Sequence, residues 1–158
     1  MCEDGRYLAV GDRGGTIYFF ETTLPDLQSS QYRIPGGVLA LSISGSGIVT
    51  ATSAAGGLYL FRNPSSQFDE NWSFQVGTSF PRLAMTGEAH HIVVGANNGS
   101  LYFLNASGQL IDRRRVKGAL SALSISETRD RLLVGSASGN VTLYSMKDRP
   151  EKLESLEA

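Results

Sequence analysis

A short pattern recurs along this chain at intervals of about forty residues, and it limits the fold more than any other feature. An apolar stretch reaches a turn with a glycine and at once resumes as a second apolar stretch. The turn glycines are Gly15, Gly56, Gly99 and Gly139, which are 41, 43 and 40 residues apart. The apolar phrases after them are Ile17 to Phe20, Leu58 to Phe61, Leu101 to Leu104 and Val141 to Tyr144. Repetition at this period indicates stacked copies of one structural unit.

Each copy is predicted to contain a β-hairpin and two further strands. In "HHIVVGANNGSLYFLN", β-branched residues favour extended backbone, and Asn97-Asn98-Gly99 tolerate the positive φ angles of a tight turn. Small alternating residues precede the hairpins, as in "VLALSIS" and "ALSALSIS", and suit a crowded inner strand. A fourth segment, such as "WSFQV", follows them. Each unit therefore reads as four antiparallel strands.

Four short antiparallel strands per unit, at a period near forty, are typical of the blades of a β-propeller. One blade cannot bury both of its faces, so blades stack around an axis. We expect an all-β propeller of about four repeats over residues 1–147, with units at about 4–34, 38–76, 80–117 and 119–146. Residues 148–158 are expected to form a polar tail with a short helix, in which Asp148 is the N-cap, Pro150 lies in the first turn and Glu151 completes a capping box.

Both terminal units are expected to be incomplete. Only Met1 to Gly5 precede the first hairpin, so unit 1 lacks an inner strand, and the polar tail leaves unit 4 without an outer strand. Such an array would expose two apolar blade faces. One interpretation is a half-propeller that a second copy completes to about eight blades, as a homodimer. The other is that the chain is one piece of a larger propeller whose remaining blades lie elsewhere.

Two phrases, "YLAVGDRGGTIYFF" and "HIVVGANNGSLYFLNASGQLI", resemble the WD40-like and PQQ-like propeller repeats of bacteria and archaea. The resemblance covers residues 4 to about 146, and it implies a propeller architecture rather than a particular activity. No unit ends in the Trp-Asp dipeptide of eukaryote-type WD40 repeats. Trp72 is the only tryptophan, so the repeated tryptophan-bearing motif of quinone-dependent dehydrogenases is missing and no cofactor is expected.

Composition and charge exclude several classes of protein. With 41% apolar and 18% charged residues, the chain matches soluble globular proteins. Its formal net charge of −1 gives no global attraction to nucleic acid or to an anionic membrane, so neither is expected as a partner. The single cysteine, Cys2, excludes an internal disulfide framework and fits a reducing compartment. Since no signal peptide or apolar run of membrane-spanning length is seen, we expect a cytoplasmic protein.

Patterns that carry catalysis or metal binding are not found. His90 and His91 are adjacent, so on a strand they would point to opposite faces, and we expect them in a surface turn. Gly45-Ser46-Gly47 leads into a strand, although a phosphate-binding loop needs a helix there. Gly135 to Gly139 carries Ala137 where a nucleophile would stand. The chain is therefore predicted not to be an enzyme.

The favoured function is a non-catalytic protein-interaction or scaffold module that presents loops at the rim of a propeller. In this fold the hairpin turns and the connections from outer to inner strands fall on the same face. The residues predicted to contact a partner on this face are Arg13, Asn97, Asn98 and Ser138. The alternative is a ligand-binding or quinoprotein-like enzymatic propeller with a small molecule in its channel. That alternative needs converging polar side chains on the inner strands, where Arg82 is the one ionisable residue.

One basic cluster, Arg113-Arg114-Arg115 with Lys117, lies in a predicted outer strand. Alternation along the strand places Arg113 and Arg115 on one face and Arg114 on the other. Three interpretations remain open: the charges protect an outer edge from mispairing, contact an acidic partner, or contact nucleic acid. Arg113 and Arg115 are therefore added to the residues predicted to bind a partner.

Overall fold

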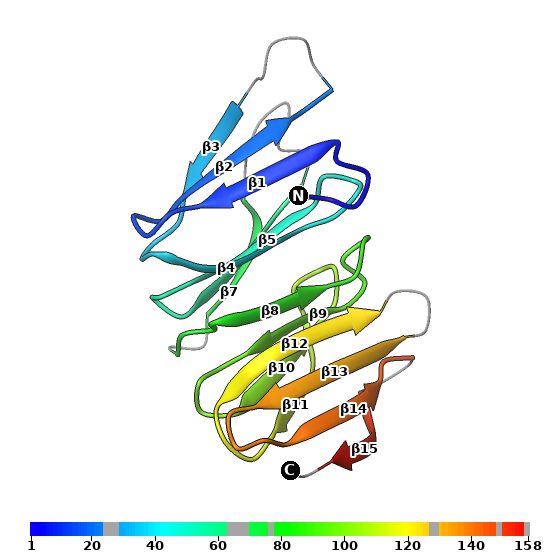
Figure 1. The fold of residues 1–158 in the computed structure, drawn as a ribbon. Coiled ribbons are helices and arrows are strands. Elements are labelled where there is room, and N and C mark those ends of the chain that lie inside the picture. The colour runs from blue at the N-terminus through cyan, green and yellow to red at the C-terminus, as the bar shows by residue number, and fades with distance from the viewer. Residues whose placement is uncertain (24–28, 63–69, 76–77, 127–129, 148–149, 157–158) are drawn as a thin grey trace.

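The computed structural model describes residues 1–23, 29–62, 70–75, 78–126, 130–147 and 150–156. These residues form fifteen β-strands and no helix, arranged as four antiparallel sheets in chain order (Figure 1). Blade 1 contains β1 (Tyr7–Gly11), β2 (Thr16–Glu21) and β3 (Ser29–Arg33). Blade 2 contains β4 (Val38–Ile43), β5 (Val49–Ser53), β6 (Gly57–Phe61) and β7 (Glu70–Gln75). Blade 3 contains β8 (Arg82–Met85), β9 (Ile92–Gly95), β10 (Ser100–Leu104) and β11 (Leu110–Arg115). Blade 4 contains β12 (Leu120–Ser126), β13 (Arg131–Ser136), β14 (Val141–Ser145) and β15 (Glu151–Leu156).

The repeated hairpins are present where the sequence predicts them. They pair β1 with β2, β5 with β6, β9 with β10 and β13 with β14, all antiparallel. The four turn glycines adopt positive φ angles, of 89° at Gly15, 85° at Gly56, 81° at Gly99 and 85° at Gly139. Glycine is the residue that reaches this region without a steric cost, so the repeat marks four equivalent turns. The predicted all-β propeller architecture is confirmed.

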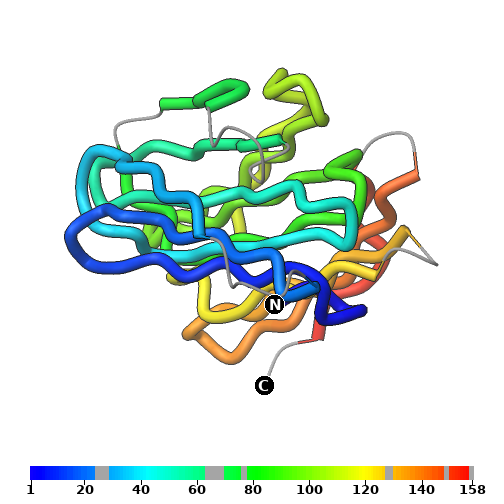
Figure 2. The backbone as a smooth tube through the Cα atoms, turned by 90° about the horizontal axis from the view of Figure 1, so that it is seen from above, coloured from blue at the N-terminus to red at the C-terminus, as the bar shows by residue number. Residues whose placement is uncertain are grey.

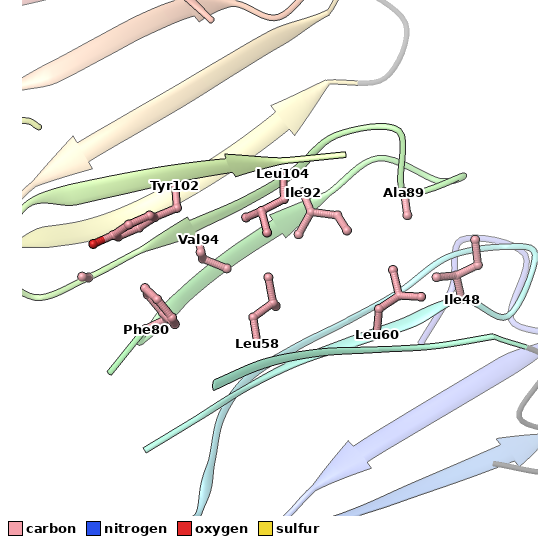
Figure 3. Close-up of a cluster of buried hydrophobic side chains, with 10 residues drawn as sticks. Ile48, Leu58, Leu60, Phe80, Ala89, Ile92, Val94, Tyr102 and Leu104 are labelled. Carbon is pink, nitrogen blue, oxygen red and sulfur yellow. The ribbon is translucent and has the colours of Figure 1, made fainter. Parts of the chain in front are cut away.

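Successive blades stack face to face, and the hydrophobic core lies between them. The innermost strands β1, β4, β8 and β12 follow one another as neighbours. Figure 3 shows the core between blades 2 and 3, where Leu58 and Leu60 of β6 point toward Ile92 and Val94 of β9. Similar cores lie between blades 1 and 2 and between blades 3 and 4. The stacking buries a continuous series of apolar side chains, which is the main source of stability in such repeats.

The C-terminal tail differs from the prediction. Residues Glu151–Leu156 form strand β15, which pairs with β14 and completes blade 4. The prediction of a short helix, and of a blade without an outer strand, was wrong. A short isolated helix is only marginally stable in water. The unpaired backbone N–H and C=O groups at the edge of β14 can instead form hydrogen bonds with the backbone of the tail. The predicted N-cap, Asp148, lies outside the described residues.

Within the part of the chain that the structure describes, the sheet of blade 1 contains β1, β2 and β3 alone, so blade 1 is the incomplete one, as expected. By its place in the repeat, β1 corresponds to β5, β9 and β13, so the missing strand is the inner one. Blades 1 and 4 lie at opposite ends of the stack in Figure 1. The four blades therefore form an open array. Within the described residues, no helix is present that is long and apolar enough to cross a membrane.

Candidate interaction surfaces

The hairpin turns and the connections from outer to inner strands lie together at one end of the strands, which is at the left in Figures 1 and 2. We call this the loop face; its turns and loops comprise residues 12–15, 34–37, 54–56, 78–81, 96–99, 116–119 and 137–140. Between blades 1 and 2, Ile34 N donates to Gly15 O at 2.9 Å. Ala54 N then donates to Gly37 O at 2.8 Å. The connection is thus held by the turn of its own blade and by the turn of the next.

The same arrangement joins blades 3 and 4. Val116 N donates to Gly99 O at 2.9 Å, and Ala137 N donates to Ala119 O at 2.8 Å. The hydroxyl of Ser138 adds a bond to Lys117 O, also at 2.9 Å. The prediction that the two sets of loops share one face is confirmed. Because turns and connections are bonded to one another, the loop face has a defined shape rather than independent loops.

Four of the side chains predicted to contact a partner lie in the hairpin turns of the loop face. Arg13, Asn97, Asn98 and Ser138 are exposed in their turns. Two of them also support the turn, because Asn98 Oδ1 accepts a bond from Ser100 N at 3.0 Å and Ser138 binds Lys117 O. Arg13 and Asn97 are exposed at equivalent places in blades 1 and 3. Their role in binding stays a prediction.

The arginine cluster lies on β11, the outer strand of blade 3. Arg113 and Arg115 pair with Tyr102 and Ser100, and Arg114 pairs with Leu101, so the predicted alternation is confirmed. The guanidinium of Arg113 lies 5.1 Å from the centre of the Tyr102 ring. Arg114 forms an ion pair of 2.8 Å with Asp112 and donates to Pro150 O at 3.1 Å. Arg114 therefore links blades 3 and 4, while Arg115 ends the strand, exposed beside the loop face.

Charge is distributed unevenly between the two ends of the strands. The described turns and connections of the loop face carry Arg13 and Lys117, and their one acid, Asp12, accepts a bond from Thr16 N at 2.7 Å within its own turn. Arg33 and Arg115 end outer strands at the same edge. The loop face is therefore positive although the formal net charge of the chain is −1.

Three acidic side chains lie together at one place on the opposite end. Glu3, Asp4 and Glu88 line a shallow depression there, together with Gly45, Ser46 and Gly87. A hydrogen bond from the Cys2 thiol, at 3.0 Å, lowers the pKa of the exposed Asp4 carboxyl, and the backbone N–H of Arg6 acts in the same direction. These carboxylates disfavour an anionic partner at this end.

The two histidines lie in the turn that enters β9, as expected, with His90 exposed and His91 half-buried. Burial lowers the pKa of His91, opposed by the charge of Asp130 and assisted by that of His90. The backbone of His91 is held by the Thr86 hydroxyl at 3.0 Å. Among the described residues, no group of three or more His, Cys, Asp or Glu side chains is placed to hold a metal ion.

The one ionisable inner-strand residue, Arg82, is hydrogen-bonded to backbone carbonyls. Its Nε donates to Ser121 O at 2.6 Å, and its Nη1 donates to Pro81 O at 2.9 Å. The first of these bonds joins β8 to β12 across the boundary between blades 3 and 4. Arg82 thus has a structural partner at this boundary.

Blade 4 leaves uncovered the face that would meet a following blade. Leu133 and Val141 lie there, 46% and 36% exposed. Their repeat equivalents Val93 and Leu101 of blade 3 are fully buried against blade 4. Leu143 and Leu156 complete the apolar area, and with Glu154 they line a shallow hollow. We call Leu133, Val141, Leu143 and Leu156 the forward face of blade 4.

Blade 1 leaves the opposite face uncovered. This uncovered face is formed by two cross-strand pairs, Leu8 with Phe20 and Val10 with Tyr18. We call these four residues the backward face of blade 1. Val10 is 47% exposed. Its repeat equivalents, all buried against the preceding blade, are Ala51, Val94 and Val134. The sequence analysis predicts two apolar end faces but does not name their residues. Alignment of the four repeats, combined with the alternation of side chains along each strand, would have identified them.

Comparison with solved structures agrees with this architecture. One similar chain, in the crystal structure of the mitotic checkpoint complex, has a TM-score of 0.81 and 14% identity over 99% of this chain and 51% of its own length. Another, Sqt1 of Saccharomyces cerevisiae, has a TM-score of 0.82 and 13% identity over 97% of this chain and 48% of its own. Both are WD40-repeat propellers, so the fold is a WD40-like β-propeller. The chain spans about half the length of these proteins. No family model and no curated protein matches the sequence.

Proposed function

We propose that this chain is a non-catalytic protein-interaction module of the cytoplasm, and that it is a half-propeller completed by a second copy. The observation that carries the proposal is the pair of uncovered end faces. Leu133 and Val10, on opposite ends of the array, are each nearly half exposed, whereas equivalent residues inside the array are buried. Apolar areas of this kind on a soluble protein mark association sites.

The two end faces are complementary because the chain already contains three joints of the same kind. In each joint the forward face of one blade packs on the backward face of the next, as Leu101 and Phe103 of blade 3 pack with Leu132 and Val134 of blade 4. The forward face of blade 4 therefore suits the backward face of blade 1 in a second copy. Two such joints, related by a two-fold axis, would close a ring of about eight blades.

Ring closure would create a complete circle of loop faces. Two copies would place eight hairpin turns on one side, with Arg13, Lys117 and Arg115 repeated about the axis. A positive surface with little acid nearby favours a protein partner with an acidic surface, and such binding is expected to weaken as salt rises. Arg13, Asn97, Asn98, Ser138, Arg113 and Arg115 are the proposed contact residues.

The experiment is light scattering on a size-exclusion column over a concentration series, with three single variants. The unmodified chain, of 17.0 kDa, is expected to elute with twice its monomer mass. Leu133→Glu and Val10→Glu each place a charge in both joints, so each is expected to give a monomer. Leu110→Glu is the matched control, because Leu110 is also 46% exposed but lies on the outer strand of blade 3.

A monomer at high concentration for the unmodified chain would refute completion by a second copy. That result would favour completion of the array by blades from another chain, with the same end faces. Dimers that survive both end-face changes but are lost with Leu110→Glu would show that a different surface mediates association.

A further inference from the structure

One position of the repeat carries a different kind of residue in blade 4. The third residue after the turn glycine is a tyrosine in each of the first three blades, namely Tyr18, Tyr59 and Tyr102. In blade 4 it is Thr142. Tyr102 pairs across its hairpin with Val94, and Thr142 pairs in the same register with Val134. The positions are therefore equivalent, and blade 4 has a small side chain where the other blades have a ring.

Inside the array, the tyrosine fills the space between neighbouring blades near their outer strands. Tyr102 is buried, and its ring centre lies 5.4 Å from that of Phe80 and 6.2 Å from that of Phe74 on β7. Tyr59 is equally buried, in the core that contains Ile34 of blade 1. A threonine has no ring. The joint between blades 3 and 4 thus lacks the group that fills the other two joints.

A pocket of about 160 Å³ lies at this place. Thr142 and Ser155, which pair across β14 and β15, line it from blade 4. The end of β11 and the connection that follows it line the pocket from blade 3. Because that connection belongs to the loop face, the pocket lies at the edge of the loop face, between the outer strands of two blades of one chain.

Three cationic side chains line this pocket: Arg115 at the end of β11, Lys117 in the connection and Lys152 on β15. No acidic side chain is among the described residues that line it. Glu154 of β15 lines the hollow on the forward face of blade 4 instead. None of the three cations forms an ion pair in the described part of the chain. Like charges around one pocket repel one another, and a bound anion removes this repulsion.

Hydroxyl groups contribute hydrogen-bond donors to the same pocket. Thr142 Oγ1 and Ser155 Oγ lie 3.3 Å apart. A hydrogen bond between two hydroxyls uses one of their two hydrogens, so the other can donate to a bound oxygen. Cations and a hydroxyl donor, without an acid, favour an anion that accepts several hydrogen bonds.

We propose that this pocket binds a phosphate group, carried by a phosphorylated serine or threonine of a protein partner. A phosphate monoester carries a charge of about −1.5 to −2 at pH 7 and three acceptor oxygens. It therefore matches three cations and a hydroxyl donor better than a carboxylate, which has a single charge. The pocket is also smaller than the roughly 300–1,000 Å³ of sites that hold a whole drug-sized ligand, which favours one phosphate group over a nucleotide.

The inference deepens the proposed function, because the choice of a protein as the carrier of the phosphate rests on the role of the chain as an interaction module. The pocket itself needs no second copy, since blades 3 and 4 of one chain supply its lining. It also differs from a general attraction of the loop face for acidic surfaces. Binding in the pocket requires the space that Thr142 leaves, whereas general attraction requires only charge.

The test is an NMR titration of the isotope-labelled full chain at low salt. The probe is an acetylated and amidated tripeptide, Gly-phosphoserine-Gly, compared with Gly-Ser-Gly and Gly-Glu-Gly capped in the same way. The phosphopeptide is expected to saturate one site and to shift the amide signals of Ser136, Thr142 and Ser155, while Gly-Ser-Gly gives no shift. Gly-Glu-Gly is expected to bind at least about tenfold more weakly. A phosphopeptide that gives no saturable shift, or binds no better than Gly-Glu-Gly, would overturn the inference.

Thr142→Tyr separates the pocket from its charge. This variant restores the residue of the other blades and fills the pocket while it keeps all three cations, so binding is expected to weaken at least about tenfold. Undiminished binding by a folded Thr142→Tyr chain would refute the site. The amide spectrum of each variant shows whether it folds.

Two arginines at equivalent positions give the matched pair. Arg115→Gln is expected to weaken binding about tenfold. Arg33 is the counterpart of Arg115 in blade 1, because Arg33 pairs with Thr16 as Arg115 pairs with Ser100. Arg33 is also exposed, so Arg33→Gln removes the same charge and is expected to change binding less than about twofold. Equal losses would show that the loop face attracts the phosphopeptide through its general charge, and this comparison decides the question if Thr142→Tyr does not fold.

Two further probes identify the carrier of the phosphate. Saturation by inorganic phosphate without saturation by the phosphopeptide would assign the pocket to the free ion and overturn the protein carrier. Phosphatidylcholine vesicles that contain phosphatidic acid are expected not to sediment the chain. Sedimentation that Thr142→Tyr abolishes would assign the pocket to a lipid headgroup and would also overturn the protein carrier.

Mass measured on the same samples distinguishes failure of this inference from failure of ring completion. A dimer that the phosphopeptide does not shift refutes the phosphate site alone. A monomer that the phosphopeptide saturates supports the phosphate site while refuting completion by a second copy.

Discussion

Replacement of Gly99 by alanine tests how the loop face is held together. Gly99 has a φ of +81°, and a Cβ added there would lie 2.5 Å from Val116 O and 2.6 Å from Gly118 O. The left-handed backbone costs an alanine roughly 1–2 kcal/mol. Crowding against two backbone carbonyls adds roughly 1–3 kcal/mol, because the connection must move away from the turn. The expected loss of unfolding free energy is thus about 2–5 kcal/mol.

Two other glycines isolate the components of this loss. Gly5 has a φ of +74° but nothing within 4 Å of its added Cβ, so Gly5→Ala carries only the backbone cost of roughly 1–2 kcal/mol. Gly45 has neither a positive φ nor a neighbour within 4 Å, so Gly45→Ala is expected to be neutral or to stabilise by up to about 1 kcal/mol.

Urea unfolding at one fixed protein concentration measures all three variants through the fluorescence of Trp72, the only tryptophan. Trp72 is a suitable reporter because its Nε1 donates to Ala106 O at 3.0 Å, across the boundary between blades 2 and 3. If Gly99→Ala loses no more stability than Gly5→Ala, the Gly99 turn does not pack tightly against the connection at residues 116–119. That result would refute the interpretation that the turns and connections of the loop face hold one another in place.

Two further predictions concern a buried hydroxyl and a histidine. Thr52→Val is expected to cost about 1–3 kcal/mol, because the buried Thr52 Oγ1 donates to Phe80 O at 2.7 Å between blades 2 and 3, with Ala40 O at 3.4 Å as a second acceptor. Thr50→Val is expected to cost less, below about 1 kcal/mol, since Thr50 Oγ1 donates to the weak acceptor Met85 Sδ at 3.5 Å. Equal losses in urea unfolding would contradict this assignment. Burial lowers the pKa of His91 in the folded chain below its ordinary 6.5. The unfolded chain therefore binds the proton more readily than the folded chain. The stability that neutral His91 contributes above pH 6.5 is lost as the pH falls through the pKa of the folded chain. His91→Gln should therefore lose less stability than the unmodified chain between about pH 7.5 and pH 5, measured by urea midpoints, and an identical loss would show that another group is responsible.

Much of the architecture is predictable because its signals are local. Gly15, Gly56, Gly99 and Gly139 indicate four turns by their φ preference, and the alternation around them indicates strands. The placement of Arg113 and Arg115 opposite Arg114 follows from the same period of two. These inferences need only a few consecutive residues, so the tertiary structure does not alter them.

The tail illustrates what local signals miss. Pro150 and Glu151 favour a helix start in isolation, yet the segment becomes β15 because β14 offers an unpaired edge. That edge exists only once blade 4 has formed.

By itself, the sequence determined the repeat, the hairpins and the small inner strands, since these depend on backbone preferences and short-range alternation. Only the tertiary structure decided which apolar faces are covered. Val10 and Val94 are equivalent valines in the repeat, yet Val10 is 47% exposed and Val94 fully buried. Burial is a property of the neighbouring blade rather than of the residue, because hydrophobic stabilisation depends on the surface that another element removes from water.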